Sequence, residues 1–293
     1  MNVTIGIMAY NEEKNIGKLL DAIISQKTKI ARIKEIIVVS DGSTDSTNDI
    51  VLKKAKKNKK VKLIAHKRRR GKSVVINNFL KNVNKKPDAI ILESADTLPA
   101  KGSIEKLCSY LKRDIGMVGA HIIPLDKEDN FFGYVSNLIW KLHHEVALQK
   151  PKFGELIAFR NIIKRIPKTA VDEEEIASLI KKKGYKLLYA KNALVYNKGP
   201  DNLKDFLKQR RRIYAGHLCL KKTRGYSVPT MGTFSVIKAL KKVKNKKLIW
   251  AFGAVCLEAC ARILGAYDYY FKKEKHFIWE TVESGKLLKP QKD

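Results

Sequence analysis

Four polar segments near the start of the chain carry side chains that suit a phosphorylated ligand. They are residues 9–12, 40–45, 70–72 and 93–97. Asp41 offers a carboxylate to the base or ribose of a nucleotide, and Lys72 offers positive charge to its phosphates. Asp96 offers the hard oxygen ligand that Mg²⁺ or Mn²⁺ prefers, and such a cation stabilises a leaving diphosphate without a proton. Together they predict a site for an activated nucleoside diphosphate.

Taken one at a time, these segments have ordinary structural explanations. Residues 41–43 form a common turn sequence, and Gly71 followed by Lys72 is not by itself a phosphate-binding loop. The acidic residues 172–175 favour the positive N-terminus of a following helix, by about 0.3 to 1 kcal/mol per charge. A site is favoured because the segments follow successive strands in order.

Apolar runs that alternate with helical patterns must position these side chains. Strands are predicted at 3–8, 35–39, 61–64, 89–92, 117–123 and 186–195. Apolar residues from Ile16 to Ile24 repeat with the helical period, and the cap-type residues Ser43 and Thr44 predict a second helix over 44–57. This order predicts an α/β fold with a mostly parallel sheet, whose ligands bind beyond the carboxyl ends of the strands.

The second half of the chain adds helices and a division into two parts. One amphipathic helix is predicted to pack on the sheet or to line an acceptor cleft, and its apolar face holds Phe131, Val135, Leu138, Leu142 and Val146. Residues 225–229 read as a linker. They divide the chain into a first domain over 1–225 and a basic, helical C-terminal region over 226–293.

The stretch from Leu248 to Phe271 is the most apolar part of the chain, although charged residues interrupt it. Glu258 and Arg262 lie four residues apart and are expected to pair on one helical face. A helix that docks on the domain or lies in a membrane interface is therefore favoured over a spanning helix, which stays the alternative. The lysines that precede it and favour an anionic surface are Lys241, Lys242, Lys244, Lys246 and Lys247.

Charge narrows the choice of partners. The 293 residues include 60 Lys plus Arg against 29 Asp plus Glu, a formal charge of +31, so polyanions are the first candidates. A basic membrane- or nucleic-acid-binding protein on a degenerate α/β scaffold is the alternative function. No aromatic residue lies near the basic segment 68–72 to stack on bases, so nucleic acid is not expected. A nucleotidyltransferase, which would release pyrophosphate, is a third hypothesis.

Cysteine usage and the N-terminus predict a cytoplasmic protein. The four cysteines show neither metal-binding spacing nor a disulfide framework, and the first apolar run lacks the features of a signal peptide. The adjacent His143 and His144 point apart on a helix, and no metal is assigned to them. With the lysine-rich C-terminal region, these features predict association with the cytoplasmic face of a membrane.

Four ordered motifs resemble those of family-2 glycosyltransferases with the GT-A fold. They are residues 9–16 (AYNEEKNI), 39–45 (VSDGSTD), 71–77 (GKSVVIN) and 94–97 (SADT). The resemblance continues to about His217 and covers roughly the first three quarters of the chain. It implies inverting, hexosyltransferase-type transfer from a nucleotide-sugar donor, such as a UDP- or GDP-sugar, to a lipid-linked or saccharide acceptor.

The resemblance also implies roles for single residues. Asp96 corresponds to the aspartate that binds Mg²⁺ or Mn²⁺. Glu173 corresponds to the base that takes the proton of the acceptor hydroxyl, and Asp172 is a close rival because the family's Glu-Asp pair is transposed here. The implied substrate-binding residues are Ala9, Tyr10, Asn11, Glu12, Asp41, Gly71, Lys72, Ser94, Gln209 and Arg212.

Two departures from the family pattern alter these expectations. Ser94 stands where the first aspartate of an Asp-x-Asp element is usual, so a lower metal affinity is expected and the metal argument depends on Asp96. Ile213 stands where the polymerising branch has tryptophan, which, with no multi-span membrane channel, predicts transfer of one sugar at a time. The neighbouring Arg210 and Arg211 are expected to face solvent or membrane.

Overall fold

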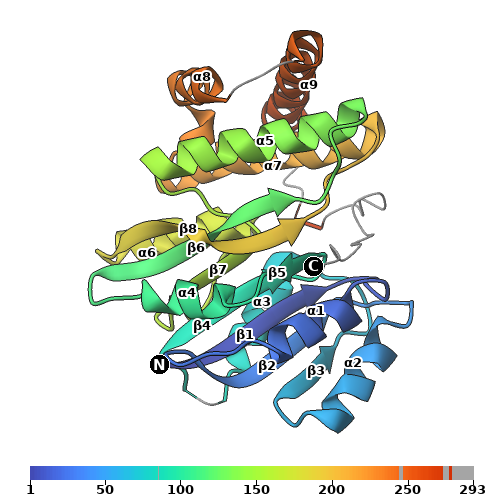
Figure 1. The fold of residues 1–293 in the computed structure, drawn as a ribbon, viewed down its shortest axis with the longest axis vertical. Helices are drawn as coiled ribbons and strands as arrows, with labels where there is room; N and C mark the ends of the chain where they lie inside the picture. The colour runs from blue at the N-terminus through green and yellow to red at the C-terminus, as the bar shows by residue number, and fades with distance from the viewer. Residues whose placement is uncertain (85, 244–246, 273–276, 279–293) are drawn as a thin grey trace.

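A computed structural model describes residues 1–84, 86–243, 247–272 and 277–278, which form a helix-covered sheet (Figure 1). The strands are β1 Asn2–Ala9, β2 Arg32–Ser40, β3 Val61–Ala65, β4 Ala89–Ser94, β5 Thr97–Pro99, β6 Ile115–Pro124, β7 Leu156–Arg160 and β8 Lys186–Asn197. The helices are α1 Ile16–Ile24, α2 Thr47–Lys57, α3 Lys72–Lys81, α4 Ser103–Ser109, α5 Phe131–Gln149, α6 Asp172–Lys182, α7 Leu203–Arg224, the short η1 Pro229–Met231, α8 Thr233–Lys242, α9 Leu248–Tyr267 and the π-helical η2 Asp268–Lys272.

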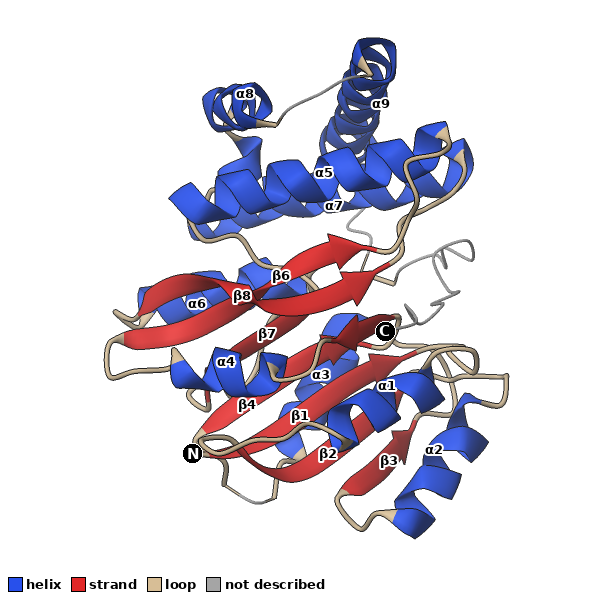
Figure 2. Cartoon of the chain, in the orientation of Figure 1, coloured by secondary structure: helices blue, strands red, loops and turns tan. Residues whose placement is uncertain are grey.

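The strands form one sheet in the order β3-β2-β1-β4-β7-β6-β8-β5, drawn in red in Figure 2. β3, β2, β1 and β4 run parallel, as do β6 and β8. β7 runs antiparallel to both β4 and β6, and β5 runs antiparallel to β8. The predicted α/β fold is therefore confirmed. Because β7 is reversed, the residue that precedes it, Glu155, lies at the carboxyl end of β4.

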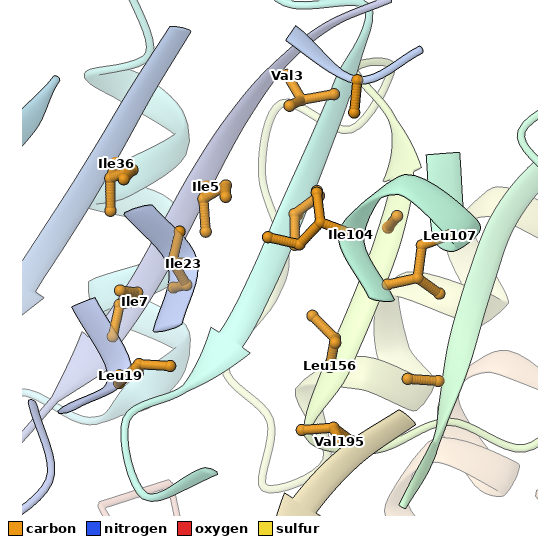
Figure 3. Close-up of a cluster of buried hydrophobic side chains, with 14 of the residues drawn as sticks. Val3, Ile5, Ile7, Leu19, Ile23, Ile36, Ile104, Leu107, Leu156 and Val195 are labelled. Atoms are coloured by element: carbon orange, nitrogen blue, oxygen red, sulfur yellow. The ribbon is translucent and has the colours of Figure 1, made fainter. Parts of the chain in front are cut away.

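Two hydrophobic layers fix the helices on the sheet. On one face, Ile5 and Ile7 of β1 lie next to Leu19 and Ile23 of α1 (Figure 3). The second layer holds α3 and α6 against the other face of the strands. Each fully buried side chain of this size contributes about 1.5 to 3 kcal/mol. The strand ends are therefore a rigid platform for polar side chains.

The second helix begins later than predicted. α2 starts at Thr47 with Ser46 as its N-cap, whereas the sequence predicts a start at Thr44. The Thr44 N–H donates to the Asn11 side chain at 2.8 Å, and Asp45 accepts from the Thr47 N–H at 3.0 Å. These bonds hold the residues before α2 in a loop beside the end of β1, so their capping-type side chains serve that loop.

Helices α5, α7, α8 and α9 form a separate layer beyond the β6–β8 part of the sheet (Figure 1). The predicted amphipathic helix is α5, and its Val135 and Leu138 join a cluster with α7 and α9. The predicted pair on α9 is confirmed, because Arg262 Nε lies 2.9 Å from Glu258 Oε1. α9 and α7 pack along each other, so the C-terminal part of the described chain is anchored on the domain.

The outer side of α9 is apolar and exposed. Ile249, Phe252 and Ile263 are 86%, 72% and 70% exposed. By length and composition, Leu248–Lys272 is the one helix of the described residues that could cross a membrane, and 17% of its most apolar window is buried. Lys241, Lys242 and Lys247 lie near its start, whereas Lys244 and Lys246 lie outside the described residues.

Candidate active site

A cavity of about 600 Å³ lies at the carboxyl ends of β1, β2 and β4, between the sheet and the layer of α5, α7, α8 and α9. The predicted site residues that line it are Ala9, Tyr10, Glu12, Asp41, Gly71, Lys72, Ser94, Asp96, Glu173, Gln209 and Arg212. Asn11 and Asp172 are not among its lining residues. The four polar segments therefore meet at one rim, as their positions after successive strands predict.

Asp41, just after β2, holds the loop that precedes α3. Its carboxylate accepts hydrogen bonds from the backbone N–H groups of Arg70 at 2.9 Å and Gly71 at 2.8 Å. Gly71 has a φ of +95°, and a Cβ there would lie 2.5 Å from the Phe277 carbonyl oxygen, so the position requires glycine. Asp41 thus fixes the turn that presents Lys72, and its contact with a nucleotide stays a prediction.

Asn11 and Glu12 join the end of β1 to the neighbouring loop and helices. Asn11 has a φ of +51°, and its amide oxygen accepts from the Thr44 N–H at 2.8 Å. The Glu12 N–H donates to Thr47 Oγ1 at 2.7 Å, and the Glu12 carboxylate accepts from Asn15 at 3.1 Å. Both residues therefore shape the rim, and Asn11 would have to leave Thr44 to reach a substrate.

Lys72 joins the first part of the site to α6. Its Nζ lies 2.8 Å from Glu173 Oε1 and 3.0 Å from Asp172 Oδ2, and its side chain is 16% exposed. Burial alone would lower the pKa of Lys72, but the charges of Asp172, Glu173 and Glu155 outweigh burial and raise that pKa. A permanent cation therefore lies between the predicted donor-binding loop and the two predicted catalytic carboxylates.

The carboxylates of Asp172 and Glu173 differ in their accessibility from the cavity and in the direction of their pKa shifts. Burial raises the pKa of Asp172, and the charge of Glu173 raises it further. Burial acts on Glu173 in the same direction, but Lys72 outweighs it and lowers the pKa of Glu173. Asp172 is 1% exposed, whereas Glu173 lines the cavity. A general base must first reach its substrate, so the geometry favours Glu173.

Glu155 is a residue of this site to which the sequence analysis assigns no role. Its φ is +45°, which is uncommon for a residue with a side chain, and its carbonyl oxygen accepts from the Ser94 N–H at 3.0 Å. Burial raises the pKa of the Glu155 carboxyl, and the charges of Asp96 and Glu173 raise it further. The acidic residue ahead of the short apolar run 156–160 is the signal that could identify it.

Arg212 of α7 completes a charged cluster. The carboxylates that interact with it are Asp96, Glu155, Asp172 and Glu173. Burial lowers the pKa of Arg212, and these carboxylates counteract burial. With Lys72 included, four carboxylates face two cations. When these six groups are ionised, they carry an excess of two negative charges.

A divalent cation matches this charge and the chemistry of the oxygen ligands. In the part of the chain that the structure describes, no three His, Cys, Asp or Glu side chains are close enough to hold a metal by themselves. Mg²⁺ commonly binds through one or two carboxylates together with substrate phosphates. Asp96 and Glu155 fit that arrangement, with the remaining ligands supplied by a diphosphate and water.

The expectation that Arg210 and Arg211 face solvent or membrane is wrong. Arg210 lines the cavity and donates to both carboxylate oxygens of Glu258, at 2.8 and 2.9 Å. Arg211 donates from Nε to Asp268 at 2.7 Å, and Asp268 is fully buried. The cause is the docking of α9 and η2 along α7, which brings their carboxylates to these arginines.

Comparison with known proteins identifies a matching family. Residues 4–183 match the profile of Glycosyl transferase family 2. An uncharacterized glycosyltransferase of Haemophilus influenzae is 32% identical over 153 residues, which make up 50% of this chain and 46% of that protein. An undecaprenyl-phosphate 4-deoxy-4-formamido-L-arabinose transferase of Pectobacterium atrosepticum is 26% identical over 45% of this chain and 39% of its own length. The matches thus span less than half the length of these two relatives.

The fold has solved counterparts. The mannosyltransferase PcManGT from Pyrobaculum calidifontis, solved in complex with GDP-Man and Mn²⁺, superposes with a TM-score of 0.65. It covers 93% of this chain and 88% of its own, at 19% sequence identity. An identity this low shows a shared fold, and here that fold is of the GT-A type.

Proposed function

Because the chain belongs to glycosyl transferase family 2, we propose that it transfers one sugar at a time, with inversion, from a UDP- or GDP-sugar to an acceptor oxygen. The observation that carries the proposal is one cavity with two unlike halves. A cluster of carboxylates and cations lines the half next to the sheet, and an apolar wall from α5, α8 and α9 lines the other. Such a cavity suits a charged donor and a partly apolar acceptor.

The donor half supports the binding of a nucleotide diphosphate with Mg²⁺ or Mn²⁺. When bound, the cation would neutralise charge that develops on the leaving diphosphate. Asp96 and Glu155 are the proposed ligands, and Lys72 and Arg212 are the proposed cationic contacts to the phosphates. Lys72 would then share its charge between the diphosphate and Glu173, from which it is 2.8 Å away.

An acceptor that brings a hydroxyl must lose a proton as its oxygen attacks the anomeric carbon. Glu173 is the proposed proton acceptor because it lines the cavity, and Asp172 is the rival because burial raises its pKa. Both belong to the first turn of α6. Their positions next to Lys72 would keep at least one carboxylate ionised for this role.

The acceptor half favours a lipid-linked acceptor over a free saccharide. Leu138, Leu142 and Val146 of α5 line it together with apolar residues of α8 and α9, and this apolar wall would pack on the hydrocarbon part of such an acceptor. The relative from Pectobacterium atrosepticum is named for undecaprenyl-phosphate. We also propose that the exposed face of α9 associates with a membrane, where such an acceptor would be found.

The test is a screen of UDP-, GDP- and dTDP-sugars with Mn²⁺. A cognate donor should raise the unfolding temperature, because a ligand that binds only the folded state stabilises it by mass action. Slow hydrolysis or transfer should release a nucleoside diphosphate. Release of pyrophosphate would instead identify a nucleotidyltransferase, and no stabilisation by any donor with Mn²⁺ would refute the proposal.

A further inference from the structure

Basic side chains also line the cavity beside its apolar wall. They come from α5, α7, α9 and the segment before β7, so the chain brings them together only by folding. Those that line the cavity are His143, Lys152, Arg210, His217 and Arg262. This cluster, called here the acceptor cation cluster, has no role in holding the donor as proposed above.

The carboxylates around the acceptor cation cluster do not balance its charge. Arg210 and Arg262 share Glu258, with Nε atoms 2.8 and 2.9 Å from its oxygens. Lys152 has Glu174 at 3.8 Å and donates to the Phe153 carbonyl at 3.3 Å. Three cations therefore have two carboxylates within ion-pair distance, and Glu173 and Glu155 act on Lys152 only from farther away. Burial lowers the pKa of Lys152, and Glu174 only partly offsets it, so an anion at this point would stabilise the ammonium form.

His143 gives a second, independent indication of a ligand-binding site. Its side chain is buried, with the residue 5% exposed, and neither ring nitrogen has a hydrogen-bond partner. Burial lowers the pKa of His143, and the charge of Lys152 lowers it further, so the ring is neutral and carries one N–H. A buried donor without a partner has a cost in free energy, because it has left water without gaining a hydrogen bond. A ligand that accepts from this ring would recover that cost.

The wall beside the acceptor cation cluster is apolar and leads to the surface. Val236, Ile237 and Leu240 of α8 and Val255 of α9 line it. Ile237 and Val255 are 47% and 48% exposed, so the wall continues onto the apolar outer sides of both helices. A ligand that follows this wall would have an anionic head inside and a hydrocarbon chain that leaves between α8 and α9.

We infer that the acceptor cation cluster binds the phosphate of a long-chain lipid phosphomonoester, and that this phosphate supplies the attacking oxygen. The inference rests on the proposed function and narrows its acceptor. One phosphate oxygen forms the new bond to the anomeric carbon as the bond to the nucleoside diphosphate breaks, and the diphosphate leaves with the electron pair. The second phosphate pKa is about 6, so the attacking group needs no base at neutral pH. The product is a sugar joined to the lipid through phosphate.

The test is a direct binding measurement on the full chain without donor. Decyl phosphate, decanol and inorganic phosphate are titrated separately by calorimetry, below the critical micelle concentration of decyl phosphate. Trp140, whose ring lies 5.3 Å from that of His143, provides a fluorescence signal for the same titrations. We expect decyl phosphate to bind at least tenfold more tightly than decanol or inorganic phosphate.

Matched variants locate the site. Lys152→Met should weaken decyl phosphate at least tenfold and leave decanol unchanged, because only the charge interaction is lost. Lys150→Met, at an exposed position two residues earlier, should bind like the wild type. His143→Phe keeps an aromatic ring of similar size and should weaken decyl phosphate at least threefold. If Lys152→Met does not fold, His143→Phe still tests the inference.

The inference would be overturned if decanol or inorganic phosphate bound as tightly as decyl phosphate. It would also be overturned if the folded variants bound decyl phosphate like the wild type. The donor screen on the same preparations separates this result from the proposed function. If a nucleotide sugar with Mn²⁺ still stabilises the protein, failure concerns the acceptor alone. If no donor binds, the proposed function itself is wrong.

Discussion

At the scale of single residues, the proposed metal binding should depend on Asp96, because Ser94, two residues earlier, adds no charge. Asp96→Asn removes one of the two proposed carboxylate ligands and leaves Glu155. We expect the affinity for Mn²⁺ to fall at least tenfold in the presence of nucleoside diphosphate. Without metal the fold should be retained, because the variant also removes the repulsion between Asp96 and Glu155. Electron paramagnetic resonance of free Mn²⁺ measures the affinity.

The matched control is Asp114→Asn, which removes an exposed carboxylate outside the site, where it pairs with Lys186 at 2.9 Å. Its Mn²⁺ affinity should equal that of the wild type. Glu155→Gln should resemble Asp96→Asn if both carboxylates are ligands. Unchanged Mn²⁺ binding in Asp96→Asn would remove the metal role from this residue.

Glu173→Gln separates the two kinds of acceptor. A phosphate oxygen is already ionised at neutral pH, so with an alkyl phosphate acceptor we expect kcat to fall less than tenfold. Loss of a general base typically costs about 10² to 10⁴ in rate. The wild-type rate should also decrease as the pH falls through the second phosphate pKa of about 6, and not through the lowered pKa of Glu173. The measurement is the pH profile of kcat/KM.

A rate loss of about a hundredfold or more in Glu173→Gln would instead identify a hydroxyl acceptor. Asp172→Asn serves as the comparison, because Asp172 is nearly inaccessible from the cavity. A large loss confined to Asp172→Asn would assign the base to the rival residue.

Single residues at strand ends could be predicted when they follow parallel strands. Asp41 and Asp96 lie after β2 and β4, where the rule for ligand binding in such sheets directs attention. Glu155 and Lys152 precede a strand, and only the reversed direction of β7 brings them to the same rim. That reversal depends on which strands pair, which periodicity within one segment does not encode.

At the scale of elements, the four carboxylates in the first turn of α6 contact different partners and also lie at the N-terminus of the helix. Asp172 and Glu173 contact Lys72. Glu174 accepts from the Phe153 N–H at 3.0 Å, and Glu175 lies 2.8 Å from Arg224. All four carboxylates lie near the positive end of the helix. Residues 172–175 can therefore contribute the predicted base and also stabilise the N-terminus of α6. The two explanations are compatible because successive helical positions point in different directions.

The contact between α7 and α9 should depend on Glu258. Burial would raise its pKa, but Arg210 and Arg262 outweigh burial and lower it to about 2 from 4.5. A lowered carboxylate pKa stabilises the fold above about pH 4.5, and that contribution is lost as the pH falls toward 2. Glu258→Gln should lower the free energy of unfolding by about 3 kcal/mol at neutral pH. Urea unfolding at about pH 7 and about pH 3.5 should show the difference shrinking.

Glu128→Gln is the control for this prediction. It breaks an exposed pair with Lys141, which should be worth less than about 1 kcal/mol. A constant difference between wild type and Glu258→Gln at both pH values would mean that charge is not the cause of the stabilisation.

Elements with a strong period were predicted within a few residues, including β1, α1 and α5. The short β5, β7 and α4 were not assigned, because three to seven residues carry too little periodicity. The i, i+4 pair of Glu258 and Arg262 was predicted from spacing alone. Its third member, Arg210, was not, because the contact requires α7 and α9 to dock. The division of the chain at residue 225 stays a prediction.

At the scale of the whole molecule, charge and apolar surface act together. The chain carries a formal charge of +31, and α9 presents an apolar outer face that begins close to Lys241, Lys242 and Lys247. A helix of this kind binds anionic membranes through buried apolar area and through attraction to headgroups. On a membrane, the charge would increase the local concentration of the protein at the surface, and the apolar side chains would provide the anchorage.

We expect the protein to sediment with vesicles that contain anionic lipid and to bind neutral vesicles more weakly. The double variant Ile249→Ser with Phe252→Ser should lower the vesicle partition coefficient at least tenfold, since each large apolar side chain contributes about 1.5 to 3 kcal/mol when buried. Raising the salt concentration should weaken the binding of both proteins, because it screens the lysines. Cosedimentation across lipid and salt concentrations measures both contributions.

Leu52→Ser is the control, because Leu52 is 48% exposed on α2, which is not part of the α8–α9 surface. Its vesicle binding should match that of the wild type. If the α9 variant binds as tightly as the wild type at low and high salt, the apolar face is not the anchor. A lipid acceptor would then have to reach the cavity without membrane docking of α9, so the same measurement also decides how the acceptor proposed above gains access to its site.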